Sequence, residues 1–235
     1  MKTYDLCLES GPQHKKTMVH VMNLAGCIAN GPTTEAALEA TPDAIRAYLR
    51  FLARHGEAVD PDAPFKTRVV EHVTKGMFLG SGSTFFEADL KALRKAEIEP
   101  LLARSRWLRA ALAGWAGSRT AKQLDAAPRG GGWPARRILL HVMPIGYLPP
   151  VLGPAKGLSS LARAAERGDV PLADAIIEIG ARNADRVRQA TAEQRAAVIE
   201  RADFPRTLRR AVRRMLEHDF EHLAELSRRP GGPEM

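Results

Sequence analysis

The chain has 235 residues, enough for one large domain or two small ones with a buried core. Hydrophobic residues make up 45% of it and charged residues 26%, which excludes a disordered or fibrous protein. No apolar run approaches the ~20 residues of a membrane-spanning helix, and residues 1–11 are too polar for a secretory signal, so we expect a cytoplasmic protein with no membrane partner.

Positive charge is concentrated in the C-terminal part of the chain. Residues 1–90 contain 9 Lys and Arg against 11 Asp and Glu, whereas residues 91–235 contain 26 against 16. Nucleic-acid recognition would need basic residues clustered on one face together with base-reading or stacking partners. The sequence shows the charge without these partners, so we expect no nucleic-acid partner.

The first third of the chain carries the signals of a small α+β unit. Two short stretches alternate apolar and polar residues on either side of a polar turn, which predicts a β-hairpin. Thr33 or Thr34 can cap a helix with apolar residues at helical spacing. The predicted elements are strands at residues 4–8 and 19–21, a helix from 33–34 to 55–56, and strands at 67–73 and 76–79. We therefore expect a β-β-α-β-β domain over residues 1–88.

Part of this region is similar to a known family. The residues concerned are Leu24-Ala25-Gly26-Cys27-Ile28-Ala29, followed by Gly31, Thr33, Glu35, Ala36 and Leu38. They resemble the Pro-Gly-Cys turn and capped helix of HicB-like antitoxin domains, with Ala25 where the family usually has proline. The resemblance implies a truncated ribonuclease-H-like sheet without catalytic carboxylates. It also implies a role in binding a protein partner or in forming a homodimer.

Residues 89–235 show the hydrophobic period of helices. The long helices are expected at residues 93–116, from Pro134 onward, at 172–190 and at 207–227. Pro100 predicts a break near the start of the first helix, and Pro144 should kink or end the second. Thr120 and Gln123 stand at capping-box spacing and predict a short helical turn. Together these elements predict an all-α four-helix bundle over residues 89–235, so the fold class is an α+β chain of two domains.

Three histidines occupy positions that should face the interior of this bundle. Steps of three or four residues along the fourth helix pass through Ala211, Met215, His218, His222 and Leu226. Similar steps along the second helix pass through Ile138, His141, Ile145 and Leu148. Burying neighbouring imidazoles costs free energy unless their nitrogens find partners, which a shared cation would provide. The sequence therefore predicts one divalent metal ion held by His141, His218 and His222, with positions left open for water or substrate.

Charged residues of the fourth helix allow two interpretations. Five arginines surround its start: Arg206, Arg209, Arg210, Arg213 and Arg214. Such a run is typical of a solvated helix face, and a site for an anionic ligand is the alternative. Glu217 and Asp219 could orient the imidazoles or supply a base, and simple exposure is the alternative. No spacing joins the remaining histidines, so we predict no role for His14, His20, His55 and His72.

A second family resemblance covers nearly all of residues 91–229. It rests on the segments Gly132-Trp133-Pro134-Ala135-Arg136-Arg137-Ile138-Leu139-Leu140-His141 and residues 207–223, together with 124–128. These segments resemble the DinB/YfiT-like family of metalloenzymes. The resemblance implies a four-helix bundle with one histidine from its second helix and two from its last, binding zinc, nickel or iron. It also implies thiol S-transferase or thiol-dependent isomerase chemistry with low-molecular-weight thiols.

Two functions from different classes follow as expectations. The first is a metal-dependent enzyme acting on a small-molecule substrate, either a transferase using a metal-activated thiol or a hydrolase using metal-activated water. The second is a non-catalytic binding protein, in which the HicB-like half docks a partner and the metal stabilises the bundle. An open coordination position at the histidines would favour the enzyme.

Overall fold

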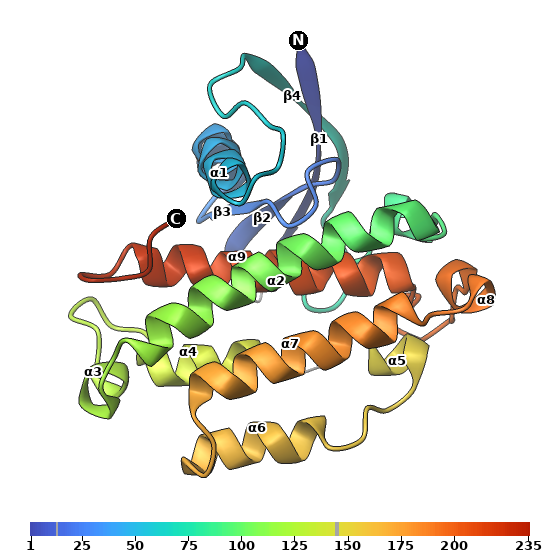
Figure 1. Ribbon diagram of the computed structural model, residues 1–235. Coiled ribbons are helices and arrows are strands. Elements are labelled where there is room, and N and C mark those ends of the chain that lie inside the picture. The colour runs from blue at the N-terminus through green and yellow to red at the C-terminus, as the bar shows by residue number, and fades with distance from the viewer. Residues whose placement is uncertain (13, 144–145) are drawn as a thin grey trace.

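A four-stranded sheet forms the N-terminal third of the computed structural model, which describes residues 1–12, 14–143 and 146–235 (Figure 1). The strands are β1 (Lys2–Gly11), β2 (Lys16–Val21), β3 (Ile28–Gly31) and β4 (Phe65–Val73), in the order β3-β2-β1-β4. The hairpin β1–β2 and the pair β2–β3 are antiparallel, whereas β4 runs parallel to β1. Helix α1 (Thr34–Arg54) connects β3 to β4 and packs against β2 and β3.

The observed order β-β-β-α-β corrects the predicted β-β-α-β-β. The hairpin, the helix and the strand at 65–73 are as expected, but residues 76–79 form turns and bends after β4. Gly76 has φ +136° there, which interrupts extended backbone. The strand β3 was missed because it is short and follows directly on a turn at Gly26, whose φ of +101° returns the chain to β2.

Helices form most of the chain after β4. They are the 3₁₀ helix η1 (Glu87–Leu90) and the α-helices α2 (Lys95–Gly117), α3 (Ala121–Asp125), α4 (Ala135–Val142), α5 (Pro149–Leu152), α6 (Leu158–Arg167), α7 (Leu172–Arg188), α8 (Ala192–Ala196) and α9 (Leu208–Ser227). The three longest confirm the predicted helices at 93–116, 172–190 and 207–227 within two residues. Thr207 caps α9 by accepting the backbone N–H of Arg210 at 3.2 Å, and Thr120 caps α3.

Two expectations about proline had different outcomes. Helix α2 continues through Pro100, so the predicted break there is wrong; proline so close to a helix start removes only one early hydrogen bond. Helix α4 ends at Val142, just before Pro144. Pro144 and Ile145 themselves lie outside the described residues, so the predicted kink and the inward position of Ile145 are not described.

Helix α9 lies between the sheet and the other helices (Figure 1). It packs on α2, α4 and α8 and also contacts β3, and its Phe220 ring lies 4.6 Å from the Tyr48 ring of α1. Buried apolar residues from both ends of the chain therefore belong to one continuous core. Helix α9 is therefore buried from solvent on both sides along most of its length.

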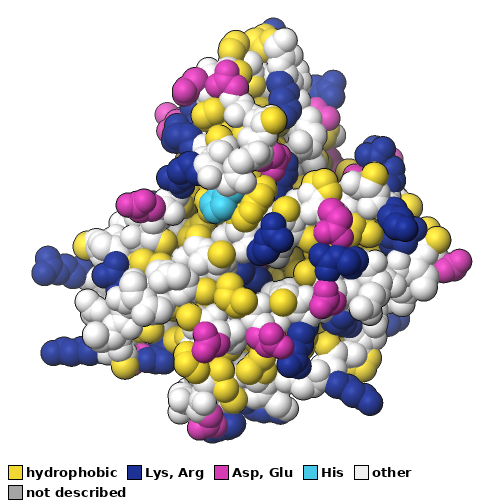
Figure 2. All heavy atoms as spheres, viewed as in Figure 1, with side chains coloured by type: hydrophobic (Ala, Val, Ile, Leu, Met, Phe, Trp, Pro, Cys, Tyr) yellow, Lys and Arg dark blue, Asp and Glu magenta, His cyan; other side chains and the backbone are white. Residues whose placement is uncertain are grey.

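This position corrects the interpretation of the α9 arginines as a solvated face. Arg210, Arg213 and Arg214 are all buried, with 6% or less of each residue exposed. On the face seen in Figure 2, basic side chains alternate with acidic ones over the helices and do not merge into one patch. Among the helices of the described residues, none has the length and apolar character needed to cross a membrane.

Candidate metal centre

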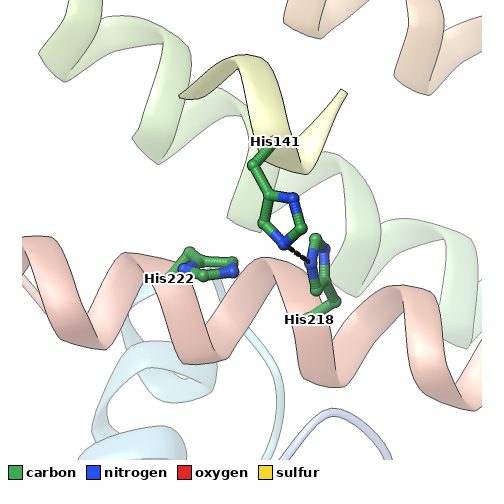
Figure 3. Close-up of side chains that lie close together, drawn as sticks. All are labelled: His141, His218 and His222. Carbon is green, nitrogen blue, oxygen red and sulfur yellow. Dashed lines mark hydrogen bonds between the residues drawn. The ribbon is translucent and has the colours of Figure 1, made fainter. Parts of the chain in front are cut away.

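Helices α4 and α9 bring His141, His218 and His222 to one place (Figure 3). His218 and His222 stand one turn apart on α9, and α4 packs against α9 so that His141 points at them. The Nε2 atoms of His141 and His218 are 3.0 Å apart, and one ligand nitrogen from each ring lies within 4.8 Å of the others. The three histidines could therefore hold a metal ion; their role as ligands stays a prediction.

The arrangement fits the geometry and the ligand preference of a divalent transition metal. Two nitrogens bound to one ion at about 2.1 Å lie roughly 3.4 Å apart at a tetrahedral angle and at most about 4.2 Å apart. The pair at 3.0 Å is close to this range, whereas a separation of 4.8 Å exceeds its upper limit, so a ring at that distance would have to turn toward the other two to share one ion. Neutral imidazole suits zinc, nickel and iron.

A carboxylate orients one of the rings from behind. His222 donates from Nδ1 to Glu225 Oε2 at 3.0 Å, which leaves Nε2 free for a ligand bond. Arg229 holds Glu225 in turn, at 2.8 Å, and donates to the backbone oxygen of Trp133 at 2.9 Å. This chain fixes the ring plane and the proton position of His222.

Electrostatics favour the neutral form that binds metals. Burial, and then the nearby charge of Arg214, hold the pKa of His218 well below its usual value. Burial, and then His222, lower the pKa of His141. His218 is buried, His222 is half-buried and His141 is exposed, so the centre reaches solvent on the side of His141.

Asp219 neither contacts the imidazoles nor is exposed, which were the two expectations from the sequence, and it has a structural role instead. It is buried and accepts from Arg109 Nε at 2.9 Å. Arg109 also donates to the backbone oxygens of Val142 at 3.1 Å and Ile176 at 3.4 Å. One guanidinium from α2 thus joins α4, α7 and α9, which fixes the end of α4 that carries His141.

Glu217 and His20 form a buried group that sequence analysis did not predict. His20 on β2 forms a hydrogen bond from Nε2 to Glu9 at 3.2 Å, and its Nδ1 atom lies 3.0 Å from Glu217 Oε2 and 3.1 Å from Arg213 Nη1. Glu217 also accepts from Arg213 at 2.8 Å. The partners come from β1, β2 and α9, so no local spacing could have indicated them. Helix α9 therefore presents imidazoles to the other helices and a buried ion-pair network to the sheet.

The cavities of the molecule differ in their relation to the histidines. A cavity of about 300 Å³ between α4 and α6 includes His141 in its wall. A larger cleft, about 950 Å³, lies between the sheet and the start of α2, and its lining includes none of the three histidines. Charged residues in that cleft pair with each other, as Arg213 does with Asp89 at 2.7 Å. A much smaller cavity, about 10 Å³, has His218 and Asp219 in its wall. Of these two cavities that adjoin the candidate centre, the one between α4 and α6 is the larger.

A comparison with known proteins finds no matching family model, no similar curated protein and no matching solved structure. The two family resemblances rest on the residues quoted for them.

Proposed function

We propose that the chain is a metal-dependent enzyme of the DinB-like kind, in which His141, His218 and His222 hold one zinc, nickel or iron ion. In this proposal α2, α4, α7 and α9 are a four-helix bundle within a domain of residues 89–235, and residues 1–88 are a HicB-like domain whose core is continuous with that of the bundle. The observation that carries it is the convergence of three imidazole nitrogens within 4.8 Å, on a side that reaches solvent.

The three-ligand set favours catalysis over a purely structural ion. Structural zinc sites have four protein ligands and are closed, whereas catalytic sites keep one position open. Bound there, a divalent ion would supply Lewis-acid chemistry and lower the pKa of a water or thiol at the open position to about 7. Glu225 holds the proton on Nδ1 of His222, and the aromatic rings of Trp133 and Tyr147 limit access around His141 and His218.

The transferase form is preferred on the family resemblance, and a reaction assay separates it from the hydrolase form. Protein loaded with zinc or nickel is mixed with 2-mercaptoethanol or cysteine and 1-chloro-2,4-dinitrobenzene, and thioether formation is followed by absorbance. p-Nitrophenyl acetate without thiol reports hydrolysis. The transferase predicts metal-dependent thioether formation that is lost in His218→Ala and kept in His72→Ala, whose ring is exposed and bonded to Ser10. Hydrolysis without thioether formation supports the hydrolase. If the protein catalyses neither reaction, the result contradicts an enzyme that acts on these substrates.

A second candidate is a non-catalytic protein whose metal stabilises the helices while residues 1–88 bind a protein partner or a second copy. The observation that favours it is the edge strand β4, where Val69 and Val70 are each about half exposed. This candidate predicts that His218→Ala lowers the melting temperature of the metal-loaded protein and that the wild type has no thiol or ester reactivity.

A further inference from the structure

The cavity between α4 and α6 adjoins the candidate metal centre, because His141 belongs to both. It measures about 300 Å³, at the small end of the range for small-molecule pockets. Its lining residues are Trp133, Arg137, Leu140, His141, Ala162, Arg163 and Glu166. Arg137 and His141 stand one turn apart on α4, so a molecule in the cavity lies against the exposed ring of His141.

Two arginines line this cavity without a carboxylate partner among the described residues. The Arg137 guanidinium lies 4.1 Å from the centre of the Trp133 ring, which holds its plane by a cation–π contact. Arg163, on α6, has a single side-chain hydrogen bond, a long one of 3.4 Å to Ser160.

Neighbouring arginines of the same helices behave differently. Arg136 pairs with Asp125 at 2.6 Å, and Arg167 pairs with Asp169 at 2.7 Å. Both lie outside the cavity lining. Within these two helices, the arginines that face the cavity are thus the ones whose charge is not neutralised in the described part of the chain.

The balance of charge in the cavity selects the kind of ligand. Arg137 and Arg163 contribute two positive charges and Glu166 one negative charge, so a group with a single negative charge leaves the cavity neutral. A carboxylate matches this balance better than a doubly charged phosphate, and guanidinium groups bind carboxylates through paired hydrogen bonds.

We propose that this cavity binds the carboxylate end of a small-molecule substrate between Arg137 and Arg163, while the reacting group of the substrate lies at the three histidines. The inference rests on the proposed function and names the substrate class: a thiol or other ligand that carries a carboxylate. Arg137 and Arg163 are specificity-determining residues, and Trp133 positions Arg137.

The test uses cobalt-loaded protein, because a thiolate bound to Co²⁺ gives a near-ultraviolet absorption band. Mercaptopropionate and mercaptohexanoate are titrated against the alcohols 3-mercaptopropanol and 6-mercaptohexanol. We expect the wild type to bind at least one mercaptocarboxylate about tenfold more tightly than its alcohol, since two charge-assisted contacts are added. The preference should fall to about one in Arg137→Met and Arg163→Met and persist in Arg136→Met and Arg167→Met. All four side chains reach solvent, so the variants should fold.

The possible outcomes separate this inference from the proposed function. If the wild type binds the mercaptocarboxylates and the mercaptoalcohols with equal affinity, the carboxylate site is overturned, whereas the metal centre is still supported. If no absorption band appears with any thiol, the thiol-dependent function is contradicted. The carboxylate site is then tested by the melting temperature of the metal-free protein. There, succinate should raise the melting temperature above that in chloride of equal ionic strength. If succinate does not raise the melting temperature, or raises it equally in Arg137→Met and Arg163→Met, the proposed carboxylate site is overturned. Larger stabilisation by inorganic phosphate than by succinate contradicts the choice of a carboxylate.

Discussion

The Nε2 atoms of His141 and His218 lie 3.0 Å apart although 77 positions separate the two residues in the sequence. Without a metal, one ring must donate its proton to the other, and a cation would replace that shared proton. The approach depends on α4 packing across α9, which Arg109 secures by binding both Asp219 and the backbone oxygen of Val142.

Replacing Glu225 with glutamine should weaken metal binding. The carboxylate orients His222 and makes its Nε2 atom a stronger metal ligand. Loss of such a partner lowers metal affinity by about 10- to 100-fold. Competition with a chromophoric chelator measures the affinity. Glu178→Gln is the control, since Glu178 forms an exposed pair with Arg182 on α7. Equal affinities for the two variants would contradict the positioning role of Glu225.

Replacing Arg213 with methionine should strongly destabilise the fold. Arg213 is buried and donates to Asp89 at 2.7 Å and Glu217 at 2.8 Å, so its removal leaves two buried carboxylates without this partner. Breaking a buried ion pair in this way costs about 3–5 kcal/mol. Urea denaturation gives the free energy of unfolding, and Arg182→Met should change it little because its pair is exposed. A small effect of Arg213→Met would mean that water enters the network.

His20 should make stability depend on pH. Burial alone would lower the pKa of His20, but Glu217 and Glu9 outweigh it and raise the pKa above 6.5. Burial alone would raise the pKa of Glu217, but Arg213 and His20 outweigh it and lower the pKa to about 2. A raised histidine pKa gives stability that is complete below pH 6.5 and is lost as the pH rises through the folded value. A lowered carboxyl pKa gives stability that is present above pH 4.5 and is lost as the pH falls toward about 2.

The measurement compares metal-free wild type with His20→Gln by urea denaturation across pH. Their difference in unfolding free energy should be largest between pH 4.5 and 6.5, where both charges are present. His141 and His218 have lowered pKa values and act in the opposite direction, so only the difference between the two proteins isolates His20. A difference that does not change with pH would show that His20 is uncharged in the fold.

Gly26→Ala should be more destabilising than Gly76→Ala. Both glycines have positive φ, at +101° and +136°, so both variants carry backbone strain of about 1–2 kcal/mol. Only at position 26 would the new Cβ clash with another side chain, the phenol of Tyr48, whereas nothing lies within 4 Å at position 76. Overpacking adds about 1–3 kcal/mol. Equal melting temperatures for the two variants would indicate that the turn moves away from α1 easily.

Helices and histidine positions could be predicted because they depend on local periodicity. The apolar stripe of α9 and its cap at Thr207 are properties of one segment, so the boundaries agree with the sequence within two residues. The inward position of His218 follows from the same stripe. His141 was harder, since its position depends on where α4 ends.

The properties that could not be predicted depend on contacts between distant segments. Burial of Arg210, Arg213 and Arg214 results from docking of the N-terminal third onto α9, on the side that a helical wheel assigns to solvent. The three side chains donate to the backbone oxygens of Ser83, Thr84 and Ser81, respectively, in the segment that follows β4. The same docking brings His20 to Glu217. Residues 76–79 have strand-like composition, but no neighbouring strand pairs with them among the described residues.

Equilibrium titration of metal-free protein with Zn²⁺ or Co²⁺ tests the central claim most directly. The account predicts one ion per chain for the wild type and for His72→Ala, and at least about tenfold weaker binding for His141→Ala, His218→Ala and His222→Ala. A wild type that binds no ion, or a His141→Ala variant that binds as tightly as the wild type, would contradict a centre shared by α4 and α9.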